Sequence, residues 1–166
     1  MVLQIRILSN ENAHFMRTLE ISQKEDFLHL HHTLQEMLGN EPAQMAKFHL
    51  ADEEWDPYLG VEVDDSHSDS EKNLHEEIGK FLKQEGDKII YEFDLLHHRY
   101  LFMELACKLK GKCKAPLFTE SIGLPPTTNP SQKKITKSRE EELPDALDSG
   151  EFEDYTELFG DIEDIF

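Results

Sequence analysis

The stretch IIYEFDLLHHRYLFMELACKL, residues 89–109, carries the strongest structural signal in this chain. Its first half alternates apolar and polar residues, as a half-buried β-strand does. The apolar positions there are Ile89, Tyr91, Phe93 and Leu95. Its second half has apolar residues on both faces of the predicted strand. One face carries Leu101, Met103, Leu105, Cys107 and Leu109, and the other carries Tyr100 and Phe102. A strand that is apolar on both faces is expected in the centre of a sheet.

The N-terminal residues predict a β-hairpin. Two alternating segments flank a polar turn at residues 9–12, which is the pattern of two paired strands. Their apolar positions are Leu3, Ile5 and Ile7, then Phe15, Leu19 and Ile21. Arg17 interrupts the apolar face of the second strand.

A helix is predicted next. Asp26 precedes apolar residues at spacings of 3, 4 and 4, and Gly39 follows them as a helix-ending residue does. The apolar residues are Phe27, Leu30, Leu34 and Leu38. The pattern indicates an amphipathic helix of about 13 residues.

Residues 48–63 predict a second hairpin, and residues 74–82 predict a second helix that ends before Gly86. The order is therefore strand, strand, helix, strand, strand, helix, strand, strand. It favours an α+β fold with a mixed or antiparallel sheet, two helices, a β-grasp-like start and an acidic C-terminal helix or tail. The core is expected to contain Leu3, Ile5, Leu30, Leu34, Phe48, Leu74, Tyr91, Phe93, Leu101 and Met103.

Charge divides the 166 residues into three segments, which together carry a net charge of −18. Residues 1–107 hold 9 basic and 22 acidic residues and form the expected domain. Residues 108–139 hold 8 basic and 1 acidic residue and form a basic connector rich in Pro, Ser, Thr and Lys. Residues 140–166 hold twelve acidic residues and no Lys or Arg, and form an acidic amphipathic tail. This charge disfavours direct binding of nucleic acid, which requires clustered basic residues.

Other features favour a cytosolic protein. A strand-like segment follows Met1 directly, and no apolar run approaches the roughly 20 residues that span a bilayer. Cys107 and Cys113 lack a second pair to complete a zinc site. Reduced cysteines without a role are expected, and a fortuitous disulfide is the alternative.

Several short motifs occur in a fixed order along residues 1–106. They are Leu30-His31, Phe48 after Met45, Leu74, Gly86-Asp87, and Tyr91-Glu92-Phe93-Asp94 before the aromatic strand. In this order they resemble the plasmid pRiA4b Orf-three-like family, the insertion-element passenger or TnpR-like proteins, which are of bacterial type. The turn Asp52-Glu53-Glu54-Trp55 and the acidic tail resemble a divergent branch of that family. The family's G-D-x-W-x-H stretch is absent, and residues 95–100 read LLHHRY instead. The resemblance implies a fold and leaves the activity open.

Nine histidines raise the possibility of a metal site. On the first predicted helix, His31 lies on the apolar face, whereas His29 and His32 point outward, so the three cannot bind one ion. We expect a buried, hydrogen-bonded His31 and no bound metal. If a metal were present, the candidate ligands would be His29, His32, His49, His97 and His98.

No sequence motif indicates catalysis. The chain contains no G-x-S-x-G elbow, no glycine-rich phosphate loop and no calcium-loop spacing among the acids of residues 52–65. We expect no cofactor and no catalytic residue. Trp55, next to these acids, is expected to pack against the edge of the core or to anchor a partner.

The tail carries a pattern of its own. Its aromatic and apolar residues follow spacings of 3, 4, 3 and 4, which predict an amphipathic helix with acids on the opposite face. They are Phe152, Tyr155, Phe159, Ile162 and Phe166. Three states remain open for this tail: docking on its own domain, folding on a partner's groove, or solvated disorder.

Two classes of function follow. The first is a non-enzymatic protein-interaction module, in which Trp55 and the tail residues bind an unknown protein. The alternative is a small enzyme or metal-binding protein that uses His and Asp residues of the central strands, with a link to mobile-element biology. The alternative requires His31, Asp94 and His97 or His98 to converge on one pocket.

Overall fold

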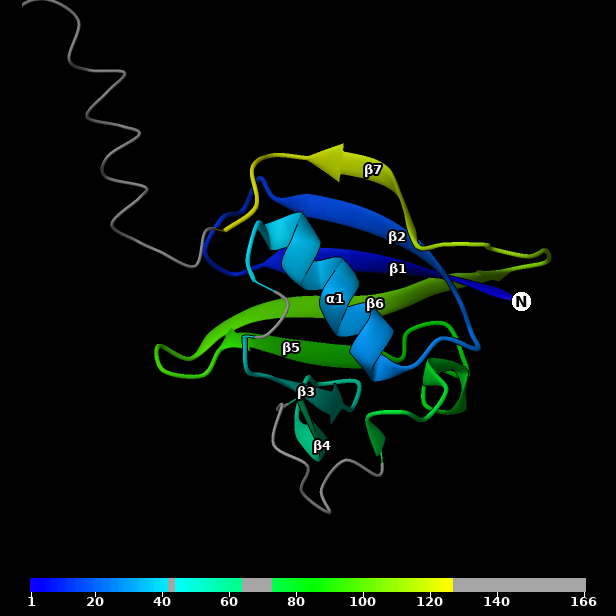
Figure 1. Ribbon diagram of the computed structural model, residues 1–166, viewed down its shortest axis with the longest axis horizontal. Helices are drawn as coiled ribbons and strands as arrows, with labels where there is room; N and C mark the ends of the chain where they lie inside the picture. Colours follow the sequence, from blue (N-terminus) through cyan, green and yellow to red (C-terminus); the bar gives the residue numbers. More distant parts are fainter. Residues whose placement is uncertain (42–43, 64–72, 127–166) are drawn as a thin grey trace, which may run out of the picture. The chain divides into compact units, whose positions relative to one another are not determined.

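Seven strands form one sheet in the computed structural model, which describes residues 1–41, 44–63 and 73–126 (Figure 1). The elements in chain order are β1 (Val2–Ser9), β2 (Met16–Ser22), α1 (Phe27–Leu38), β3 (Ala46–Ala51), β4 (Pro57–Val63), the 3-10 turn η2 (Ile78–Lys80), β5 (Lys88–Asp94), β6 (Arg99–Leu109) and β7 (Leu117–Ile122). The described residues belong to the first of two compact units, Met1–Thr128. No helix among them is long and apolar enough to cross a membrane.

The strand order is β4-β3-β5-β6-β1-β2-β7, and all six pairings are antiparallel. Both predicted hairpins form, as β1–β2 and β3–β4. Strand β6 occupies the central position, which confirms the prediction from its two apolar faces. Strand β7 was not predicted: it lies in residues 108–139, which the sequence analysis assigns to the connector, and it pairs with β2.

The predicted fold class is wrong in two respects. Among the described residues there is one α-helix instead of two. The start is not β-grasp-like either, because a β-grasp pairs its first strand with a parallel neighbour, whereas β1 is antiparallel to both of its neighbours, β2 and β6. The topology is an antiparallel sheet with α1 on one face, which Figure 1 shows in front of the central strands.

The second predicted helix does not form because backbone carbonyls of residues 23–25, just before α1, accept hydrogen bonds from its N–H groups. The N–H of Ile78 donates to the carbonyl of Glu25 at 2.8 Å, and the N–H of Gly79 donates to the carbonyl of Gln23 at 2.9 Å. Gly79 lies so close to Gln23 that a Cβ atom there would approach the carbonyl oxygen to 2.8 Å. Leu74, Ile78 and Leu82 are buried nonetheless. The apolar spacing therefore predicted correctly that these residues are buried, and predicted wrongly that they form an α-helix.

Helix α1 forms where its end signals predict. The side chain of Asp26 accepts a hydrogen bond from the N–H of His29 at 2.8 Å, which satisfies one free donor of the first turn. Gly39 ends the helix in the left-handed conformation, with φ of 75°, and its N–H donates to the carbonyls of Gln35 and Glu36.

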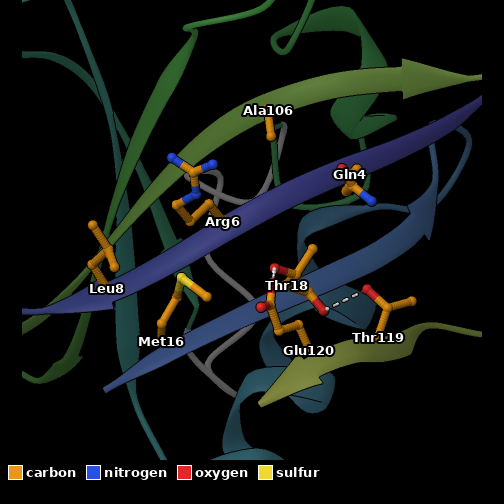
Figure 2. A pocket seen from close by; sticks show the side chains of 8 residues that line it. All are labelled: Gln4, Arg6, Leu8, Met16, Thr18, Ala106, Thr119 and Glu120. Carbon is orange, nitrogen blue, oxygen red and sulfur yellow. Dashed lines mark hydrogen bonds between the residues drawn. The ribbon is translucent and has the colours of Figure 1, made fainter. Parts of the chain in front are cut away.

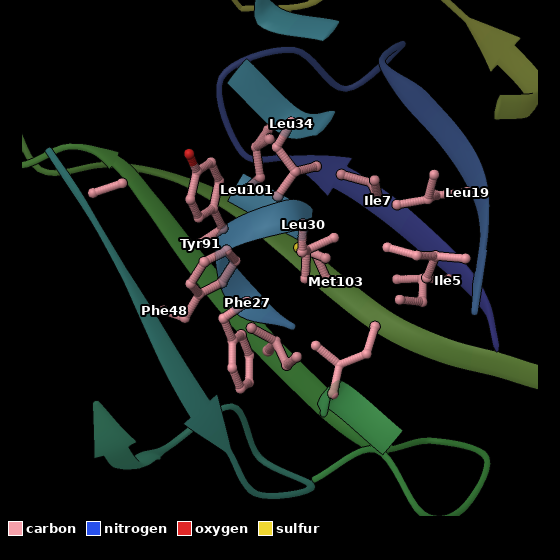
Figure 3. Close-up of a cluster of buried hydrophobic side chains, with 14 of the residues drawn as sticks. Ile5, Ile7, Leu19, Phe27, Leu30, Leu34, Phe48, Tyr91, Leu101 and Met103 are labelled. Carbon is pink, nitrogen blue, oxygen red and sulfur yellow. The ribbon is translucent and has the colours of Figure 1, made fainter. Parts of the chain in front are cut away.

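The core lies between α1 and the sheet, and all ten predicted core residues are buried in one cluster. Figure 3 shows Phe27, Leu30 and Leu34 of α1 beside apolar side chains of the strands. Phe27 contacts Phe48 with a distance of 5.2 Å between ring centroids. The two cysteines are free thiols in the structure, and Cys107 lies beside Gln4 on the opposite side of the sheet.

Leu34→Ala tests the contribution of the helix to this core. Leu34 is fully buried, so its truncation is expected to lower the free energy of unfolding by about 2–5 kcal/mol, measured by urea denaturation. Glu36→Ala, at an exposed position of the same helix, is the control and should change stability by less than about 0.5 kcal/mol. Equal midpoints for the two variants would show that α1 does not contribute to the core.

Candidate functional site

The face of the sheet opposite α1 is the open face. Among the described residues, no helix covers it. Outward positions of an antiparallel sheet are ordinarily polar, because they meet water. The side chains on this face are therefore the first candidates for a functional surface.

Five neighbouring strands each place an apolar side chain in one line across the open face. Directly paired residues of adjacent antiparallel strands lie on the same face, so the strand register alone defines this line. Its members, the apolar row, are Ile90, Phe102, Leu8, Met16 and Ile122. Leu8 is 42% exposed and Ile122 is 48% exposed, and the other three are half-buried.

Trp55 covers one part of the apolar row. Its ring meets Phe102 edge to face, with 5.3 Å between centroids, and Lys88 Nζ lies 5.2 Å from the Trp55 ring centre. Trp55 adopts a positive φ of 70° in a turn that the carboxylate of Asp52 stabilises by accepting from two backbone N–H groups. The ring is half-buried on the open face instead of at the edge of the core. Its role as a partner anchor stays a prediction.

A groove of about 700 Å³ adjoins the exposed part of the apolar row (Figure 2). Its lining residues are Gln4, Arg6, Leu8, Met16, Thr18, Ala106, Thr119 and Glu120. The Thr18 hydroxyl donates to the carboxylate of Glu120 at 3.3 Å, and the Thr119 hydroxyl donates to the carbonyl of Thr18 at 3.5 Å. One wall of the groove is thus held by hydrogen bonds between β2 and β7.

Arg17 holds the end of β7 in place from the α1 side of β2, opposite the groove. Its guanidinium donates to the carbonyls of Met16, Ile122 and Gly123 at 2.7–2.9 Å, and it lies 4.7 Å from the Phe15 ring centre. Burial lowers the pKa of Arg17 from its usual value. The residue that interrupts the apolar pattern of β2 is therefore structural.

Glu92 lies at the centre of a polar cluster on the open face. This buried carboxylate accepts from His49 Nε2 at 2.9 Å and from His98 Nδ1 at 3.0 Å, if both ring nitrogens carry protons. Burial and the charge of Glu92 raise the pKa of Tyr100, its cross-strand neighbour. The two imidazoles therefore bind one carboxylate instead of facing a shared vacant centre.

Asp94 and His97 form a separate pair at the turn between β5 and β6. The carboxylate of Asp94 accepts from His97 Nδ1 at 2.9 Å and from the backbone N–H of the same residue at 3.1 Å. Burial acts to raise the pKa of Asp94, but these hydrogen bonds and the charge of Arg99 outweigh it, so the pKa is lowered overall.

His31 lies on the other side of the sheet, in the core. His31 Nδ1 is 2.7 Å from the hydroxyl of Tyr91, and Gln35 Nε2 donates to the same hydroxyl at 2.7 Å. Burial raises the pKa of Tyr91 far above its usual value, and the hydrogen bond from Gln35 opposes this only in part. The prediction of a buried, hydrogen-bonded His31 is confirmed.

The structure does not bring together the groups that the enzyme or metal alternative requires. His31 contacts Tyr91 in the core, whereas Asp94 contacts His97 at the turn and His98 contacts Glu92 on the open face. Within residues 1–41, 44–63 and 73–126, no three His, Cys, Asp or Glu side chains are arranged to hold a metal ion. Freedom from metal and cofactor stays a prediction.

The predicted tail residues Phe152, Tyr155, Phe159, Ile162 and Phe166 lie outside the described residues. The sequence analysis missed the apolar row. The outward positions of Met16 and Phe102 were its visible signal, because both break the polar alternation of their strands.

Comparison with known proteins decides the family. A family model described as "Plasmid pRiA4b ORF-3-like protein" matches residues 1–127. The chain belongs to this family. The match confirms the resemblance found in the sequence, and it extends through β7, which lies beyond the predicted domain end at residue 107.

A solved structure shares the fold of this pRiA4b ORF-3-like chain. It is the crystal structure of a protein of unknown function from Methanosarcina mazei Go1, with a TM-score of 0.63 and 15% sequence identity over 96% of this chain and 90% of that chain. At this identity the likeness shows the fold alone. A search of the curated proteins found no match.

Tyr91→Phe tests the buried polar contacts. The change removes the hydroxyl that His31 and Gln35 share, and a buried polar group that loses a partner costs about 1–3 kcal/mol. We expect the free energy of unfolding to fall by about that amount in urea denaturation. Tyr58→Phe, which is 68% exposed, is the matched control and should have little effect. An unaltered midpoint for Tyr91→Phe would contradict a stabilising role for this hydroxyl.

Proposed function

We propose that this pRiA4b ORF-3-like protein is a non-enzymatic protein-interaction module. The apolar row carries the proposal. Single exposed apolar residues are ordinary on protein surfaces, but contiguous ones mark binding sites. Here five strands contribute to one line, and its most exposed part borders a groove.

The acidic tail is the second part of the proposed module. Twelve acids and no Lys or Arg in residues 140–166 would select a partner with a basic or apolar groove. Phe152, Tyr155 and Phe159 supply the large apolar side chains that dominate protein interfaces. Trp55 belongs to this proposal as an anchor at the half-buried end of the apolar row.

The enzyme alternative has less support from the geometry. Its histidines are divided among Tyr91, Glu92 and Asp94, which lie at successive or nearly successive positions of β5. A catalytic site needs such groups to converge on one substrate. We therefore propose binding rather than catalysis.

Affinity purification from cells that naturally produce the protein tests the proposal. The full chain should capture a protein that the variant Phe152→Ser/Tyr155→Ser/Phe159→Ser, which keeps every tail charge, captures poorly. Met16→Asp should weaken the same capture, because it places a charge within the apolar row. Glu36→Lys, on the exposed side of α1, is the control and should capture normally. Capture that is equal for all four proteins would count against the proposal.

A further inference from the structure

The groove beside the apolar row contains a cation, Arg6, that has no partner in the part of the chain that the structure describes. The polar rows that flank the apolar row carry three cations. Lys47 pairs with Glu62 at 3.3 Å, and Lys88 lies 3.6 Å from Glu104. Arg6 is exposed in the groove and has no hydrogen bond or ion pair with any described residue, and Figure 2 shows its guanidinium between Leu8 and Ala106.

This arrangement defines the chemistry of a ligand. Arginine binds carboxylates with two parallel hydrogen bonds, which gives both strength and orientation. Arg6 and Leu8 project from the same face of β1 two residues apart, at a separation of roughly 7 Å. A fitting ligand therefore carries a carboxylate about 7 Å from an apolar side chain that covers Leu8 and Met16.

Residues i and i+2 lie on one face about 7 Å apart in an extended chain, so this contact requires the tail to bind as an extended segment instead of the amphipathic helix that its spacing predicts. In that form the tail has the required chemistry four times. An acid stands two residues after each of four apolar tail residues, in Phe152-x-Asp154, Tyr155-x-Glu157, Phe159-x-Asp161 and Ile162-x-Asp164. We propose that the groove around Arg6 binds the acidic tail, residues 140–166, of a second copy of this chain. This inference rests on the proposed function and names its partner. Each copy carries both a groove and a tail, so two such contacts can close a symmetric pair.

Net charge opposes this association, and among the groove's lining residues the guanidinium of Arg6 alone favours it, because Glu120 lines the same groove and Glu104 stands directly across from Arg6 on β6. The chain carries −18 in total, but salt screens exposed charges beyond about 8 Å at physiological ionic strength. Contact with the guanidinium of Arg6 lies well within that range. Glu120 forms part of the same groove, and its carboxylate accepts from Thr18, so the ligand carboxylate must lie on the Arg6 side.

Analytical ultracentrifugation of the full chain tests the inference. We expect concentration-dependent dimers of the wild type. Arg6→Glu should raise the dimer dissociation constant about tenfold or more, and Arg6→Gln should have a smaller effect in the same direction. Lys24→Glu makes the same change in net charge at an exposed site whose side chain has no partner among the described residues, and is expected to dimerise normally.

Mixing two variants makes the test specific for exchange between copies. Arg6→Glu keeps an intact tail, and Phe152→Ser/Tyr155→Ser/Phe159→Ser keeps an intact groove. Each alone should be monomeric, and their mixture should form heterodimers through one restored contact. A monomeric wild type, dimers that tolerate Arg6→Glu, or a mixture that stays monomeric would overturn the inference. If capture of a host protein still depends on the tail in that case, the interaction module stands without self-association; if it does not, both proposals fall.

Discussion

Strand β6 must fit neighbours on both edges and both faces, and the rest of the structure depends on how it does so. Its edges pair with β5 and β1, and its core side contributes Leu101, Met103 and Leu105. A shift of one residue would turn these buried side chains to water, so the core fixes the register. That register also fixes the opposite face. Phe102 lies beside Leu8 and Ile90 only while Leu101 and Met103, which flank it in β6, are buried. The apolar row is thus a consequence of the same pairing that forms the core.

Strand alternation also separates the ionisable groups of β5. Tyr91 faces the core and meets His31 and Gln35 of α1, whereas Glu92 faces the open side and meets His49. Buried polar contacts add little net stability, but they penalise any other position of the helix, because each displaced group would lose its partner. Tyr91 therefore specifies the place of α1 on the sheet. Glu92, one residue later, fixes two imidazoles on the other side.

The sequence predicted the features that depend on local pattern. The caps of α1 could be predicted because Asp26 and Gly39 each act within one turn of the helix. The central place of β6 could be predicted because a strand that is buried on both faces carries apolar residues on both. The segment around Ile78 could not, because a carbonyl of the segment before α1 satisfies its N–H, and apolar spacing does not reveal distant backbone partners. Strand β7 was hidden for a similar reason: it is an edge strand with one partner, and its polar composition resembles a linker.

The apolar row on the open face could not be predicted from the sequence for the same reason. Leu8, Met16 and Ile122 come from three strands, one of them unpredicted, so their alignment exists only once the register is known. In the proposed contact, the apolar row and Arg6 have complementary effects on binding. Apolar burial supplies affinity but discriminates weakly between partners, whereas a guanidinium donates hydrogen bonds to a carboxylate and repels a cation. A face that combines the two selects for the sign of its ligand as well as for its size. The net charge of the chain is −18, so selection of an anionic ligand is opposed by the charge of the protein as a whole. Arg6, which has no partner among the described residues of the open face, is therefore the group on which the proposed selection of a ligand depends.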